Sequence, residues 1–170
     1  MLADLESDDV AIRHRAIEQV LAVKGVVDHR AIKAIADKYI AEGRKKGTVR
    51  DALRLLGKLQ AREYIPYLVS LLPLRVHEDD SSRPPEIATT FPAAGALIDL
   101  GLPSIRPVLE RLRHESDPDA LLAGAGVLRK VLGKEGAFKF IRTELKTAPR
   151  DEIPSLTKVQ ELLKSHYMLM

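Results

Sequence analysis

The chain has 170 residues, with 27 lysines and arginines against 24 aspartates and glutamates, so its formal net charge is only +3. This near balance gives no bulk electrostatic argument for a nucleic-acid partner. Cysteine is absent, which excludes disulfides and thiolate metal sites.

The apolar residues indicate a helical protein. They make up 45% of the sequence, are mostly leucine, alanine, isoleucine and valine, and leave only 4% aromatic residues. Leucine and alanine favour helices, whereas strands favour aromatic and β-branched residues. No stretch reaches the ~18 apolar residues of a membrane span, and the acidic N-terminal segment lacks a signal-peptide pattern. We expect an all-α protein with no membrane contact, and a cytoplasmic location is favoured.

Four glycines divide the chain into repeating units, because each follows an apolar helical pattern. Gly25, Gly57, Gly101 and Gly133 are 32, 44 and 32 residues apart. At eight, five, four and one residues before each glycine, fourteen of sixteen positions are apolar, and these offsets share one helical face. A glycine directly after such a face predicts a helix C-terminus with positive φ.

Helix starts and second helices can be placed around these glycines. The runs Ser7-Asp8-Asp9 and Ser116-Asp117-Pro118-Asp119 supply capping side chains, acidic residues and an N-terminal proline. A second helical pattern follows each glycine, in residues 28–43, 63–72, 104–115 and 135–145. We expect one domain over residues 1–170, built from about four helix pairs and without strands.

Two segments depart from this repeat. The long interval holds a polar stretch near residues 74–86, rich in serine, proline and acidic residues, which predicts an inserted surface loop. A last amphipathic helix is expected near residues 152–166, capping the array with Leu156, Val159, Leu162 and Leu163 facing inward. The sequence closes with the apolar Tyr167-Met168-Leu169-Met170. Packing on the final repeat, continuation of the chain and a partner-binding tail all stay open.

Short motifs in these units resemble HEAT repeats. Residues 8–16, "DDVAIRHRA", and 48–53, "TVRDAL", look like the D-x-x-V-R-x-x-A signature of that family. Residues 55–72 are similar to the end of one HEAT helix and the start of the next. The resemblance covers about residues 5–147, although the third and fourth units have no Val-Arg pair. It implies an α-α superhelix of the HEAT or armadillo kind, with a groove that holds other macromolecules.

Residues 46–59, "KGTVRDALRLLGKL", predict a helix with an apolar face and a basic stripe. The apolar side gathers Val49, Ala52, Leu53 and Leu56. The stripe consists of Arg50, Arg54 and Lys58, spaced four residues apart, and Asp51 is placed to pair with Arg54. The resemblance puts this helix on the concave, partner-facing side. Two interpretations stay open: a solvated helix face, which is favoured, or a surface that binds an acidic protein or a phosphate-bearing ligand.

Two His-Glu dipeptides, His77-Glu78 and His114-Glu115, lie 37 residues apart, which is about one repeat. HEAT-like deoxyhypusine hydroxylases hold a di-iron centre with recurring His-Glu pairs, a donor set that suits iron. That family uses four pairs at the starts of inner helices. Here one pair falls in the polar insertion and the other at a helix end, where we expect both to face solvent. We therefore expect no metal and no cofactor.

Other functional templates lack the residues that they need. HEAT-like alkylpurine DNA glycosylases carry tryptophans in their groove, and this chain has no tryptophan on which bases can stack. The P-loop, nucleophile-elbow and H-E-x-x-H patterns do not occur. Gly124 and Gly126 follow a helix cap rather than a strand, so we expect them to permit close helix packing instead of holding phosphate.

The favoured function is therefore a non-enzymatic protein-interaction scaffold or adaptor. A linear array of helix pairs presents a long groove, which suits another macromolecule better than a small substrate. The runner-up is a binder of a phosphate-bearing ligand or nucleic acid through Arg50, Arg54 and Lys58. A metal-dependent HEAT-like enzyme is third. The identity of the partner, the process that it serves and the oligomeric state are not encoded in any motif that we find.

Overall fold

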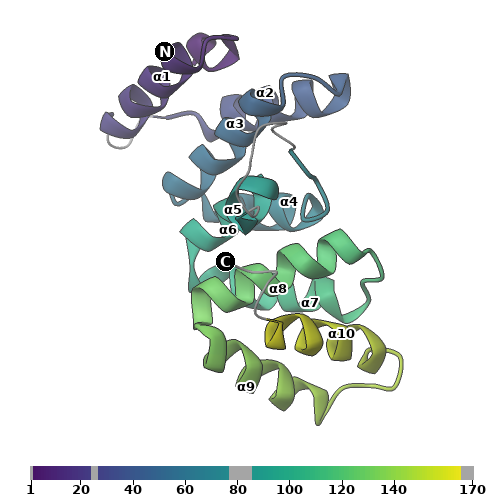
Figure 1. Ribbon diagram of the computed structural model, residues 1–170. Helices are drawn as coiled ribbons and strands as arrows, with labels where there is room; N and C mark the ends of the chain where they lie inside the picture. Colours follow the sequence, from purple (N-terminus) through teal and green to yellow (C-terminus); the bar gives the residue numbers. More distant parts are fainter. Residues whose placement is uncertain (1, 24–26, 77–85, 166–170) are drawn as a thin grey trace.

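The computed structural model describes residues 2–23, 27–76 and 86–165 (Figure 1), and every regular element in these ranges is helical. This confirms the expected all-α class. The α-helices are α1 Val10–Ala22, α2 His29–Glu42, α3 Lys46–Lys58, α4 Ile65–Ser70, α5 Ile87–Thr90, α6 Pro92–Leu100, α7 Ile105–Arg113, α8 Pro118–Leu132, α9 Lys134–Leu145 and α10 Ile153–Lys164. Short 3-10 helices are η1 Ala3–Glu6, η2 Arg62–Tyr64 and η3 Leu102–Ser104.

The helices follow one another from one end of the molecule, at α1, to the other, at α9 and α10 (Figure 1). Helix α3 packs on α1, α2 and α6, while α6 packs on α3, α4 and α8. Helix α8 in turn contacts α7, α9 and α10. The four helices that carry the apolar patterns ahead of the spaced glycines are therefore neighbours, in the order α1, α3, α6, α8.

The apolar face predicted for α3 is confirmed, because Val49, Ala52, Leu53 and Leu56 are all buried. They belong to one hydrophobic core that continues through α6, α7 and α8. In α10, Leu156, Val159 and Leu163 are buried as expected, whereas Leu162 is only half-buried. Among the described residues, no helix is both long and apolar enough to cross a bilayer.

Two of the predicted helix ends are confirmed. Gly101 and Gly133 follow α6 and α8 with φ of 71° and 74°, a left-handed region that favours glycine. The starts of α1 and α8 are also as predicted. The Asp9 side chain accepts from the Ala11 N–H at 2.7 Å, and the Asp117 side chain accepts from the Asp119 N–H at 2.8 Å. These ends form locally, so sequence patterns identify them well.

The helix end predicted at Gly57 is correct to within one residue, because α3 ends at Lys58, but Gly57 does not have the predicted positive φ. This residue is buried inside α3, and a Cβ atom built on it would lie 2.6 Å from the Ala96 Cα atom of α6. Gly57 therefore lets two helices approach closely. The left-handed residue after α3 is Gln60, with φ of 56°. The predicted end at Gly25 lies outside the described residues, as do residues 77–85 of the insertion and the apolar residues 167–170.

Close packing at Gly124 and Gly126 is confirmed. A Cβ atom at Gly124 would lie 2.7 Å from a Leu112 methyl group of α7, and one at Gly126 would lie 2.7 Å from an Ile87 methyl group of α5. A side chain at either position would collide with a neighbouring helix. The presence of both glycines within α8 lowers its helix propensity.

Candidate functional site

The basic stripe lies on α3, but its three members have different surroundings. Lys58 is exposed, Arg54 is half-buried, and the Arg50 side chain is only 14% exposed. The Arg50 Nε atom lies 3.2 Å from the Asp51 Oδ1 atom. Arg50 is therefore held against its own helix, and only Arg54 and Lys58 line the adjoining groove.

The expected pairing of Asp51 with Arg54 is wrong. Asp51 is buried, and its Oδ2 atom accepts a hydrogen bond of 3.0 Å from the Nε atom of Arg13, 38 residues away on α1. Its Oδ1 atom faces Arg50 instead. Helix α1 covers this part of α3, so a carboxylate that would be solvated on an isolated helix pairs with an arginine brought by tertiary packing.

Arg13 is a structural residue that was not identified as such from the sequence. Besides Asp51, its Nη1 atom donates to the carbonyl oxygens of Ser7 and Asp8, at 2.9 Å and 3.0 Å. The guanidinium thereby ties the start of α1 to α3. One signal was available: Arg13 stands three and seven residues before the buried Ala16 and Val20, so it belongs to the apolar face of α1.

A groove of about 270 Å³ separates α1 from α3 beside this ion pair. One wall is formed by α1 and the other by α3; the lining residues are His14, Ile17, Glu18, Leu21, Asp51, Arg54, Leu55 and Lys58. The Arg54 Nε atom is inaccessible to solvent and has no hydrogen-bond partner. A buried donor without an acceptor lowers stability, and because this atom is closed to solvent it does not offer its N–H to a ligand in the groove.

The two His-Glu dipeptides do not form a common site in the described residues. His77-Glu78 lies outside them. His114 is exposed, as expected, but Glu115 is buried, which corrects the expectation that both residues face solvent. The Glu115 Oε1 atom accepts from the backbone N–H groups of Ser116 and Asp117, and its Oε2 atom lies 2.6 Å from Arg111. Glu115 therefore orders the turn that leads into α8.

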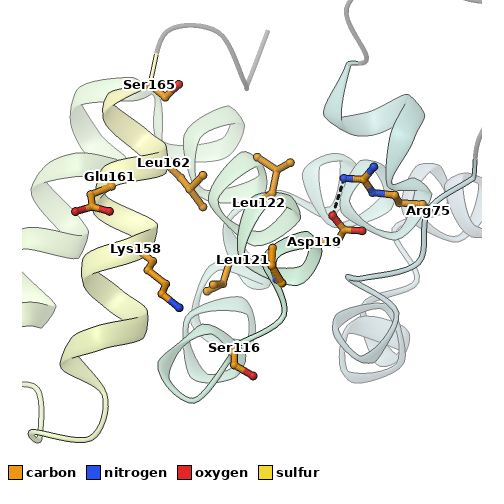
Figure 2. Close-up of a pocket in the computed structure, with 10 residues that line it drawn as sticks. Arg75, Ser116, Asp119, Leu121, Leu122, Lys158, Glu161, Leu162 and Ser165 are labelled. Carbon is orange, nitrogen blue, oxygen red and sulfur yellow. Dashed lines mark hydrogen bonds and ion pairs between the residues drawn. The ribbon is translucent and has the colours of Figure 1, made fainter.

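A second, larger pocket of about 540 Å³ lies between α8 and α10 (Figure 2). Leu121 and Leu122 of α8 and Leu162 of α10 supply its apolar surface. Polar residues stand around them: Arg75, Ser116, Asp119, Lys158, Glu161 and Ser165. Arg75 and Asp119 pair with each other at 2.6 Å, as the dashed line in Figure 2 shows.

This pocket was missed because it is formed by segments far apart in the sequence. Arg75 follows α4, whereas Leu162 belongs to the last helix (Figure 2). The only signal was Leu162, which shares the predicted inward face of α10 but stays half-buried because no described helix covers it. Leucine surface with charged groups at its edge is suited to hold an apolar side chain of a partner.

Comparisons with protein-family models, with curated proteins and with solved structures find no match to this chain.

Proposed function

We propose that the chain is a short α-solenoid that acts as a non-enzymatic protein-binding module. The order of neighbouring helices α1, α3, α6 and α8 supports the solenoid, because consecutive units then contact mainly their neighbours. The HEAT-like motifs around Arg13 and Arg50 support the same architecture.

The observation that carries the binding function is the pocket between α8 and α10. Its surface is leucine, and the charged groups around it include the Arg75–Asp119 pair, which leaves no net charge at that edge. A pocket of this kind stabilises an inserted aliphatic or aromatic side chain by removing apolar surface from water, at about 25 cal/mol per Å². Buried apolar anchors of this type dominate the binding energy of protein interfaces.

Affinity capture with matched variants tests this proposal. Leu122→Asp places a carboxylate in the leucine surface, where its desolvation opposes insertion of an apolar anchor. Leu102→Asp makes the same change at a leucine that is 70% exposed in η3, away from the pocket. Proteins retained by the wild type and by Leu102→Asp should be lost with Leu122→Asp.

Circular dichroism shows whether each variant keeps its helical content before capture. Glu161→Lys changes an exposed residue at the pocket edge, so it carries little risk to folding. It should change the retained amount of the same proteins that Leu122→Asp loses. The proposal is contradicted when the retained set is unchanged by both pocket variants.

A second candidate function, binding of an anionic group through α3, is favoured by one observation. Arg54 and Lys58 line the groove and make no ion pair with any residue that the structure describes. Two unpaired cations on one groove wall favour an anionic ligand.

A further inference from the structure

We infer that the groove between α1 and α3 binds an acidic peptide segment of a partner protein. In this arrangement a carboxylate pairs with Arg54 and Lys58, and an adjacent apolar side chain packs on the groove floor. The inference rests on the proposed function, because it specifies the partner chemistry of a protein-binding module. It concerns the opposite end of the molecule from the pocket between α8 and α10 (Figure 1).

The size of the groove suits a short extended segment. Its lining runs from His14 to Leu21 on α1 and from Asp51 to Lys58 on α3. Seven residues of helix span about 10 Å at a rise of 1.5 Å per residue. An extended peptide advances about 3.3 Å per residue, so about three residues fit along the groove.

The charges in the groove leave two cations available. Both oxygens of Asp51 face arginines, with Arg13 at 3.0 Å and Arg50 at 3.2 Å, so this carboxylate is already neutralised. Arg54 and Lys58 stand one turn apart on the same wall, and neither pairs with a described residue. A ligand carboxylate seated in the groove would lie beside both cations. A planar guanidinium is well suited to bind such a carboxylate through two nitrogens.

The floor of the groove is apolar. Ile17 and Leu21 come from α1 and are half-buried, and Leu55 comes from α3. These aliphatic side chains offer no hydrogen bond to a phosphate group. They can bury a leucine or isoleucine side chain that neighbours the acidic residue of the ligand. A segment that combines acidic and aliphatic residues therefore matches both parts of the groove.

The opposite wall argues against a nucleic acid. Glu18 is exposed on α1 and faces the groove, where it repels a continuous chain of phosphates. The lining contains no tryptophan, tyrosine or phenylalanine on which bases could stack. A peptide carboxylate held by Arg54 and Lys58 on the α3 wall lies across the groove from Glu18, and the peptide backbone N–H groups can donate hydrogen bonds to the Glu18 carboxylate.

The test is a nuclear magnetic resonance titration of the full chain, labelled with ¹⁵N. The probe is a short peptide in which glutamate and leucine alternate; a lysine–leucine peptide and a single-stranded oligothymidylate serve as comparison ligands. We expect the glutamate–leucine peptide to shift the backbone amides of α1 and α3 that line the groove, with no localised shift from the comparison ligands.

Charge-matched variants complete the experiment. Arg54→Gln combined with Lys58→Gln should weaken peptide binding about tenfold or more, because charge-assisted hydrogen bonds are lost. Lys130→Gln combined with Arg142→Gln removes the same charge from exposed positions on α8 and α9, and should change affinity less than about twofold. Both double variants replace side chains that are not fully buried, so folding should persist.

Three results would overturn the inference: equal binding by both double variants, shifts that map away from α1 and α3, or oligothymidylate shifting the same resonances as the peptide. The last result would assign the groove to a phosphate polymer. None of these results tests the pocket between α8 and α10. The capture experiment with Leu122→Asp tests that pocket independently.

Discussion

At the scale of single residues, the Arg13–Asp51 pair has the largest structural role near the candidate groove. Both side chains are 7% exposed, and Arg13 also satisfies two backbone carbonyls. A buried ion pair pays a large desolvation cost, so its formation adds little stability, but loss of one partner leaves an uncompensated charge. The pair therefore acts to fix the position of α1 on α3, which sets the width of the groove.

Asp51→Ala should lower the free energy of unfolding by about 3–5 kcal/mol, because Arg13 stays buried without its carboxylate. Urea denaturation of the wild type and the variant measures this difference. Asp119→Ala breaks the more exposed pair with Arg75 and should cost less than about 1 kcal/mol. Similar losses for the two variants would mean that Arg13 finds another partner or reaches solvent.

At the scale of elements, the contact between α3 and α6 depends on small residues. Ala93, Ala94 and Ala96 of α6 are fully buried, and Gly57 of α3 lies against the Ala96 backbone. This approach is possible because no side chain separates the helices there. A backbone atom cannot move aside as the end of a flexible side chain can, so the position tolerates no Cβ atom without a shift of one helix.

Gly57→Ala should therefore destabilise the protein by about 1–3 kcal/mol, although alanine has the higher helix propensity. Gly136→Ala is the matched control, since its Cβ atom would approach nothing closer than 3.5 Å on an exposed part of α9. That change should stabilise the protein by about 0.5–1 kcal/mol. Thermal or chemical unfolding compares them, and effects of the same sign would contradict the proposed close approach.

At the scale of the whole molecule, the central and terminal helices are not equally buried. Residues of α6 are almost all buried, whereas Val10 and Ile12 of α1 are 50% and 41% exposed. The N-terminal end is also held by ionic contacts. The Glu6 carboxylate accepts from Lys38 at 2.6 Å and from the Tyr39 hydroxyl at 2.8 Å. These hydrogen bonds, led by that of Lys38, lower the pKa of Glu6 from its ordinary value of 4.5.

This arrangement predicts that acid loosens the N-terminal end first. Because the folded pKa of Glu6 lies below 4.5, its ionised form stabilises the fold above that pH, and the contribution is lost as pH falls through the folded value. The pKa of Glu63 is lowered in the same direction by its hydrogen bond with His29. Hydrogen-exchange protection of η1 and α2, corrected for intrinsic rates, should fall as the pH is lowered from 4.5 toward the folded pKa of Glu6, and should fall more than that of α6.

Glu6→Gln provides the control for this experiment. It removes the titrating group, so protection of η1 and α2 should already be lower at pH 7 and should change less on acidification. Parallel loss of protection in α2 and α6 would show that the chain unfolds as one cooperative unit, against the gradient expected of the proposed solenoid.

The sequence by itself determined the helical class, the caps at Asp9 and Asp117, the helix ends at Gly101 and Gly133 and the buried face of α3. These features depend on residues within about four positions of one another, so periodicity and capping chemistry are sufficient to identify them. It also placed Arg54 and Lys58 on a polar face. Tertiary structure decided which groups contact each other. Asp51 pairs with Arg13, and Gly57 lies against α6. Arg50 is held beside Asp51 and does not line the groove, and Leu162 lines a pocket with Leu121 and Leu122. Each of these outcomes depends on packing between segments far apart in the chain, which a local pattern cannot specify because the same face can be solvated or covered.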